Sequence, residues 1–145
     1  MDRVNPRTRS RIMAAVKSRG GRTTERRLRA HIVASGIRGW RVNLKPLPGS
    51  PDFAFPRQKL AVFVDGCFWH GCPRCYRVPK SRVAFWTTKV ASNVRRDRRQ
   101  SRMLRSSGWR VIRLWEHAVL MAPGACVQRI EVALALRGRR RKRAA

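Results

Sequence analysis

The chain has 145 residues, with 35 Lys and Arg against 7 Asp and Glu, so its formal net charge of +28 indicates a polyanionic partner. Nucleic acid is the first choice, with ribosomal RNA or an anionic membrane surface as alternatives, and the excess of Arg over Lys fits phosphate contacts or a GC-rich genome equally. A hydrophobic fraction of 43% can fill one core, and the absence of a bilayer-spanning stretch and of a signal-peptide run predicts one cytoplasmic domain with no membrane association.

Residues 1–22 are interpreted as a basic N-terminal arm, with helical material in its middle and a flexible pair of glycines near its end. A helix is predicted over residues 23–35. Thr23 is a favourable N-cap, and Gly36 can adopt the left-handed conformation that ends a helix. The folded domain is therefore expected to begin at residue 23.

Glu25 lies on the inward face of this predicted helix. The buried stripe is marked by Leu28 and Ile32, which follow Glu25 by three and seven residues. An inward carboxylate needs a partner in the folded protein. The alternative interpretation is that Glu25 only complements the helix dipole in the first turn.

Three strands are predicted next, over residues 40–42, 52–55 and 60–64. The last two flank residues 56–59, a connection of hairpin length that contains a proline. Asp52 therefore opens a strand and lies beside a loop.

The C-terminal half predicts two helices and one strand. A long helix is expected over residues 82–106 and ends before Gly108, a buried strand follows over residues 109–115, and an amphipathic helix spans residues 125–136. Residues 137–145 are expected to form a basic, disordered tail that adds salt-dependent affinity for nucleic acid.

A cluster of cysteines follows the second strand of the hairpin. Cys67, Cys72 and Cys75 form a C-x4-C-x2-C run, which is typical of thiolates that bind a tetrahedral zinc ion. In a reducing compartment such cysteines are metal ligands or free thiols rather than disulfides. The run supplies three ligands, and the candidates for the fourth are His70, His117 and Cys126.

The carboxylates and the histidine near the ends of the hairpin strands indicate a second chemistry. Asp52 stands at one strand end, Asp65 follows the end of the next, and His70 comes five residues later. Divalent-metal nucleases use this layout, in which oxygen ligands hold Mg²⁺ against the scissile phosphate. A neutral histidine can then activate water, so the layout favours a nuclease.

A series of motifs in fixed order then resembles one known family. The motifs are Thr8-Arg9-Ser10 with Met13, Thr24-Glu25, Leu47-Pro48-Gly49 with Pro51-Asp52-Phe53, Val64 to Cys72, Phe85-Trp86, Asn93-Val94 with Arg96 to Arg99, Gly108 to Val111 and Trp115-Glu116. Together they are similar to the very short patch repair endonucleases, over residues 8–136.

This resemblance implies a restriction-endonuclease-like α/β fold, in which helices flank a central mixed β-sheet and a structural zinc site is present. It also implies a strand-specific, Mg²⁺-dependent nick in double-stranded DNA, on the 5′ side of the thymine in a T:G mismatch that arises from 5-methylcytosine deamination. The endonuclease domain would span residues 23–136 and would be associated with the nucleoid of a bacterial cytoplasm. A single nick needs one active site, so a monomer is expected, with repair proteins as further partners.

The resemblance also assigns roles to individual residues. It implies that Asp52 is the Mg²⁺ carboxylate, the backbone carbonyl of Val64 the second protein ligand, His70 the general base and Glu25 an organiser of metal-bound water. With His70 used as the base, the implied zinc ligands are Cys67, Cys72, Cys75 and His117. Such a site is closed and would fix the loop that carries His70.

Phe68, Trp69 and Trp86 resemble the family's aromatic wedge, which enters the DNA stack beside the mismatch, and Met13 on the arm would enter from the other groove. A plain core role is the alternative for these aromatics. Neighbouring side chains of an extended segment point to opposite sides, so Phe68 and Trp69 are not both expected to be buried. Unstacking costs least at a mispair, so a wedge would contribute to selectivity.

Two departures from the family pattern are visible. Asp65 stands where some members carry a histidine, and an aspartate there would repel phosphate unless it binds metal as a further catalytic residue or pairs with an arginine. Cys72 stands where some members use a histidine as a zinc ligand. Competing hypotheses are a defence nuclease of the same fold without mismatch preference and a zinc-stabilised nucleic-acid-binding protein without catalysis.

Overall fold

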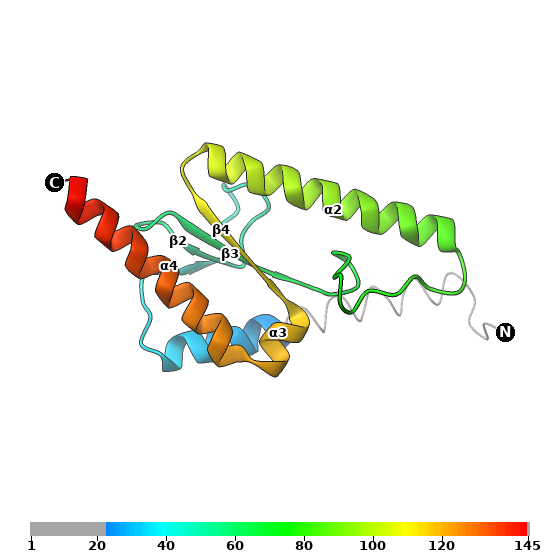
Figure 1. The fold of residues 1–145 in the computed structure, drawn as a ribbon, viewed down its shortest axis with the longest axis horizontal. Helices are drawn as coiled ribbons and strands as arrows, with labels where there is room; N and C mark the ends of the chain where they lie inside the picture. The colour runs from blue at the N-terminus through cyan, green and yellow to red at the C-terminus, as the bar shows by residue number, and fades with distance from the viewer. Residues whose placement is uncertain (1–22, 145) are drawn as a thin grey trace.

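The computed structural model describes residues 23–144 as a mixed α/β domain, shown in Figure 1, and the predicted arm with Met13 lies outside them. Four strands form one sheet in the order β1-β2-β3-β4. They are β1 (Arg41–Val42), β2 (Phe53–Phe55), β3 (Leu60–Asp65) and β4 (Arg110–Trp115). The predicted combination of a central mixed sheet with flanking helices is therefore confirmed.

The sheet is antiparallel on one side and parallel on the other. β2 pairs antiparallel with β3, with Ala54 opposite Ala61, so the predicted hairpin is confirmed. β3 pairs parallel with β4, and their last residues, Asp65 and Trp115, are opposite each other. A parallel pair needs a long crossover, which α2 (Val83–Ser106) provides. The segments after β3 and after β4 consequently leave the sheet at the same edge.

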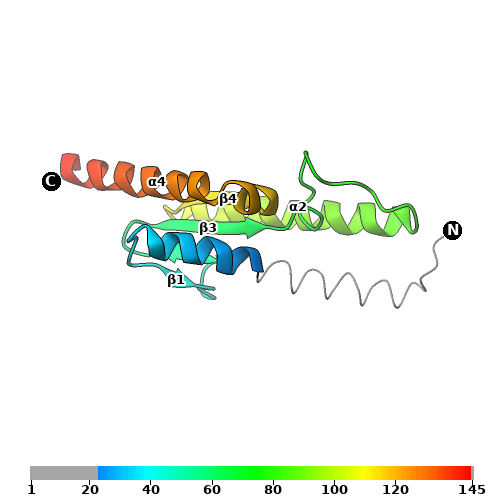
Figure 2. The same cartoon turned by 90° about the horizontal axis from the view of Figure 1, so that it is seen from below.

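Two hydrophobic clusters, one on each face, hold the helices to the sheet. Leu60 and Val62 of β3 pack with Leu28 and Ile32 of the helix over residues 23–34 and with Ile130 of α4 (Pro123–Ala144). On the other face, Ala61 and Phe63 pack with Leu104 of α2. Figure 1 shows the sheet between α2 and the helix over residues 23–34, and Figure 2 shows that helix and α4 running beside β3.

The helix over residues 23–34 ends as predicted, because Gly36 has a φ of 74° in the left-handed region. Thr23 is already helical and so does not take the predicted N-cap position. Within residues 23–144 no helix is long and apolar enough to span a bilayer.

The predictions for the C-terminal region need two corrections. The short helix α3 (Glu116–Met121) was not predicted, since six residues are too few to show a helical period. The prediction of a disordered tail is wrong for residues 137–144, which continue α4. Arg and Lys have high helix propensity, and extending an existing helix requires no new nucleation.

Candidate active site and metal centre

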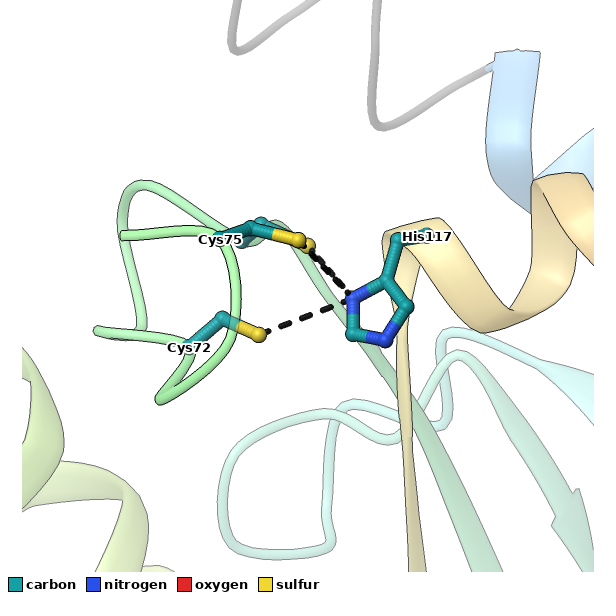
Figure 3. A group of neighbouring side chains, drawn as sticks. Cys72, Cys75 and His117 are labelled. Carbon is teal, nitrogen blue, oxygen red and sulfur yellow. Dashed lines mark hydrogen bonds between the residues drawn. The ribbon is translucent and has the colours of Figure 1, made fainter. Parts of the chain in front are cut away.

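Three cysteines and one histidine converge at the edge of the sheet where β3 and β4 end. Sγ atoms of Cys67, Cys72 and Cys75 lie 3.3, 3.5 and 3.3 Å from Nδ1 of His117. Figure 3 shows Cys72 and Cys75 directed at the ring of His117. A zinc ion bound at about 2.3 Å from sulfur and about 2.0 Å from nitrogen in a tetrahedron would separate these atoms by about 3.5 Å. The four residues therefore form a group that fits a tetrahedral metal ion.

The parallel pairing of β3 with β4 is what brings these ligands together. Cys67 follows β3 by two residues, and His117 lies in the first turn of α3, directly after β4. The other two candidates for the fourth position lie elsewhere: His70 contacts Asp97, and Cys126 is buried in the main core. The geometry thus selects His117.

Metal binding would also resolve the charge state of the buried thiols. The pKa of Cys67 is raised to about 12, mainly by burial and also by the neighbouring thiols, against a hydrogen bond from the backbone of His117. For Cys72 burial also acts to raise the pKa, but hydrogen bonds from the backbone of Cys75 and Arg74 outweigh it and leave that pKa lowered. A bound cation holds such thiols as thiolates, since metal ligation displaces their protons.

Gly71 allows the cysteine loop to pack closely against α2. Its φ is 64°, and a Cβ there would lie 3.1 Å from a methyl group of Val90. The side chain of Asn93 donates a hydrogen bond of 3.0 Å to the carbonyl of Trp69. These contacts fix the loop between the metal-binding group and α2.

A cavity of about 580 Å³ adjoins this loop and collects most of the acidic side chains of the domain. We call it the acidic cavity, and its carboxylates belong to Glu25, Asp52, Asp65, Asp97 and Glu116. Glu25 reaches it from the helix over residues 23–34, which is the inward orientation that its spacing predicts.

Asp52 is the carboxylate whose environment most favours a cation. The backbone N–H of Val64 donates a hydrogen bond of 2.6 Å to its Oδ2. The pKa of Asp52 is raised to about 8, mainly by burial and also by the hydrogen bond and charge of Glu25 and the charge of Asp65, while the bond from Val64 opposes the increase. Within residues 23–144 no ion pair joins Asp52 to a basic side chain. A divalent cation would supply the missing charge.

His70 is held by a carboxylate that the sequence analysis did not select. Its Nδ1 lies 2.5 Å from Oδ2 of Asp97, on α2, and 3.8 Å from Oδ1 of Asp65. Burial acts to raise the pKa of Asp97, but the hydrogen bond and charge of His70 and the charge of Arg113 outweigh burial and lower it. The signal was present in the sequence: Asp97 lies on the buried face of α2 with Asn93 and Ser101, at spacings of four.

Asp65 pairs with an arginine on the neighbouring strand, β4, which is one of the two alternatives left open for this carboxylate. Nη1 of Arg113 donates to both carboxylate oxygens of Asp65, at 3.0 and 3.2 Å. The same guanidinium donates to Ser101 Oγ at 3.0 Å and to the carbonyl of Asp97 at 3.2 Å, and it stacks 4.1 Å from the ring centre of Phe63. Burial raises the pKa of Asp65, while His70 and Arg113 oppose the increase.

Asp65, His70 and Asp97 form a second group whose ligand atoms are close enough to hold a metal. A cation there would compete with the guanidinium of Arg113 for Asp65 and with the Asp97 contact for Nδ1 of His70. The charges of this group are already balanced by neighbouring side chains. Asp52 and Glu25 therefore offer the better place for a divalent ion.

The aromatic residues form one cluster rather than an exposed pair. The segment carrying Phe68 and Trp69 is a turn, not the extended chain that we expected, so their rings contact each other at 5.2 Å and both are partly buried. Trp86 packs 5.5 Å from Phe68 and 5.8 Å from Trp69 and is only 4% exposed. Among the described residues its indole Nε1 has no hydrogen-bond partner.

Comparison with known proteins gives one consistent result. The sequence model of the family described as DNA mismatch endonuclease Vsr matches residues 1–77. The DNA mismatch endonuclease Vsr of Escherichia coli K12 is 40% identical over 114 residues, which are 77% of this chain and 71% of that protein. The type II nicking enzyme V.XorIIP of Xanthomonas oryzae is 41% identical over 117 residues, 79% of this chain and 84% of the relative. The type II nicking enzyme V.NmeDIP of Neisseria meningitidis is 37% identical over 136 residues, 92% of this chain and 90% of the relative.

Proposed function

Because the chain belongs to the DNA mismatch endonuclease Vsr family, we propose that it nicks double-stranded DNA on the 5′ side of the thymine in a T:G mismatch and requires Mg²⁺. The observation that carries this proposal is the acidic cavity. In it Asp52, which pairs with no basic side chain of residues 23–144, lies with the His70–Asp97 pair. Relatives named nicking enzymes support cleavage of one strand. One strand requires one active site, so we propose that the protein acts as a monomer, with repair proteins as further partners.

Asp52 and the backbone carbonyl of Val64 would hold the Mg²⁺ ion, and Glu25 would organise its water ligands. The donor set is all oxygen, as Mg²⁺ prefers. Bound there, Mg²⁺ would polarise a phosphoryl oxygen and neutralise charge that develops during cleavage. The pairing of Asp65 with Arg113 makes Asp65 a charge-balanced neighbour of this site rather than a ligand.

His70 would act as the general base. The contact with Asp97 places the ring proton on Nδ1 and leaves Nε2 as the nitrogen that can accept a proton from water. Asp97 is suited to this role because its pKa is lowered and it therefore stays ionised at neutral pH. Asp97 thus orients the imidazole and stabilises the cation that forms when water is deprotonated.

The group of Cys67, Cys72, Cys75 and His117 is proposed to bind a structural Zn²⁺ ion. Its four ligands leave no open position for a substrate, as in closed structural sites. The ion would join the loop after β3 to the start of α3 and so hold His70 and the aromatic cluster in place.

Mismatch recognition is proposed to use the aromatic cluster and the arm. Phe68, Trp69 and Trp86 would form the wedge, with Met13 approaching from the other groove. Trp86 would have to leave its packed position to contact bases, and its unbonded indole nitrogen lowers the cost of that movement. The proposed divisions are an arm of residues 1–22 and an endonuclease domain of residues 23–136 with a restriction-endonuclease-like fold.

The test is cleavage of end-labelled duplexes that carry T:G, U:G or C:G at one position, with wild type and Asp52→Ala compared in the presence and absence of Mg²⁺. We expect a nick in the thymine strand of the T:G duplex only, lost in Asp52→Ala, which should still bind the duplex. Equal cleavage of all duplexes would indicate a nuclease of the same fold without mismatch preference. Binding without cleavage by the wild type would indicate a non-catalytic binding protein.

A further inference from the structure

A second cavity, of about 870 Å³, shares a wall with the acidic cavity. Both are bordered by Asp65, His70, Asp97 and Arg113. These four residues, which include the proposed base His70, therefore lie between the acidic cavity and the second cavity.

The second cavity is lined by five arginines of α2, and we call it the arginine groove. They are Arg95, Arg98, Arg99, Arg102 and Arg105, and all five are exposed. Their spacing of three and four residues places them on one face of the helix, beside the buried face that carries Asn93, Asp97 and Ser101. From Arg95 to Arg105 the stripe covers about 15 Å of the helix axis, at a rise of about 1.5 Å per residue.

Within residues 23–144 these five side chains lack the acidic partners that other arginines of the site have. Arg113 pairs with Asp65, and Arg96 lies 3.4 Å from Asp97. In the part of the chain that the structure describes, no ion pair joins any of the five to a carboxylate. Like charges three and four residues apart destabilise a helix, so the stripe is unfavourable for α2 unless an anionic partner compensates it.

We propose that the arginine groove binds consecutive phosphates of the cleaved DNA strand, on one side of the scissile bond. The inference rests on the proposed function, because the groove begins at His70, where the scissile phosphate would lie. One strand of a duplex carries a phosphate every 3.4 Å of axis and winds around that axis, so a stripe of about 15 Å can reach several consecutive phosphates. The strand would pass from the acidic cavity across His70 into the groove.

The arginine groove differs in chemistry from the aromatic cluster. Guanidinium groups on phosphates fix the register of the duplex without reading its sequence, whereas the aromatic residues would contact the mismatch. The groove would therefore bind paired and mispaired DNA with the same affinity. Its role would be to position the strand for cleavage.

The test compares a groove variant, Arg95→Gln/Arg98→Gln/Arg102→Gln, with a control variant, Arg27→Gln/Arg38→Gln/Arg57→Gln. The control removes the same charge from exposed arginines outside α2. Dissociation constants for an intact T:G duplex are measured in Mg²⁺-free buffer over a range of salt concentrations. The slope of log Kd against log salt should fall by about three for the groove variant, about one for each lost phosphate contact, and by less for the control. A groove variant with Lys at the three positions should recover the slope.

Methylphosphonates, which remove the charge of single phosphates, then locate the contact. Consecutive substitutions on one side of the scissile bond of the cleaved strand should weaken binding by the wild type and by the control variant but have no further effect on the groove variant. Equal salt slopes for the groove and control variants, or interference confined to the complementary strand, would overturn the proposal. Because binding is measured without cleavage, a wild type that does not nick T:G duplexes would overturn the proposed function and leave this result interpretable.

Discussion

Nδ1 of His70 and Oδ2 of Asp97 lie 2.5 Å apart, although the two residues are 27 positions apart in the chain. One belongs to the loop after β3 and the other to α2, so the contact exists only when the loop is packed on the helix. It fixes both the orientation of the imidazole and the nitrogen that carries the proton. If His70 is the general base as proposed, Asp97 would act on the reaction through it.

Replacing Asp97 with Asn should slow cleavage without weakening DNA binding. The amide can donate as well as accept, so it no longer fixes the proton on Nδ1 and cannot stabilise the imidazolium. We expect the single-turnover rate to fall about 100-fold, in the range typical of general-base catalysis, while Kd for the T:G duplex stays within about twofold. His70→Ala should lower the rate at least as much, and the double variant should be no slower than His70→Ala. Additive losses would show that the two residues act independently.

The same carboxylate gives a prediction for stability against pH. Because the folded pKa of Asp97 lies below its ordinary value of 3.8, the ionised form is favoured in the folded state. Its contribution is present above the unfolded pKa and is lost as pH falls through the folded pKa. In urea unfolding, the stability advantage of the wild type over Asp97→Asn should shrink as pH falls from about 5 toward 3. An advantage that grows on acidification would contradict this assignment.

The regular elements could be predicted from the sequence, whereas most of the contacts that make the site could not. Two apolar runs around a proline-containing turn give the hairpin, and the spacing of Val90, Val94 and Leu104 gives α2. These signals are local. Motif resemblance pointed to His117 as a metal ligand, and the structure brings it to the three cysteines.

Arg113 shows why the remaining contacts were missed. In the sequence it is one basic residue in a buried strand, and nothing local indicates a partner. Its pairing with Asp65 depends on the parallel register of β3 and β4 and on the face that each residue occupies. The turn over Phe68 and Trp69 was missed for a different reason, since its signals are local: Gly66 and Gly71 flank it, and the backbone N–H of His70 donates to the carbonyl of Gly66.

The purified protein should contain one zinc ion per chain, and its removal should destabilise the domain. Ligation joins two segments 50 positions apart, so His117→Ala should lose the metal and lower Tm markedly. Metal analysis and thermal unfolding measure both effects. Cys126→Ser is the matched control: it changes a buried thiol outside the group and should keep the metal. Retention of zinc by His117→Ala together with loss in a His70→Ala variant would exchange the roles of the two histidines.

Arg113 and Asp65 should depend on each other for stability. Arg113→Met leaves the buried carboxylate of Asp65 without its cation and releases the carbonyl of Asp97. Removing one partner of a buried pair is strongly destabilising, and because the Arg113 side chain is 23% exposed we expect a loss of about 2 kcal/mol in urea unfolding. The double variant Asp65→Asn/Arg113→Met should lose less than Arg113→Met alone, since it leaves no unpaired charge. A double variant that loses the sum of the two single losses would show that the pair has no such coupling. The nicking rate then separates positioning from stability: a folded double variant that nicks more slowly than Asp65→Asn alone would show that Arg113 holds Asp97 and His70 in place for the reaction.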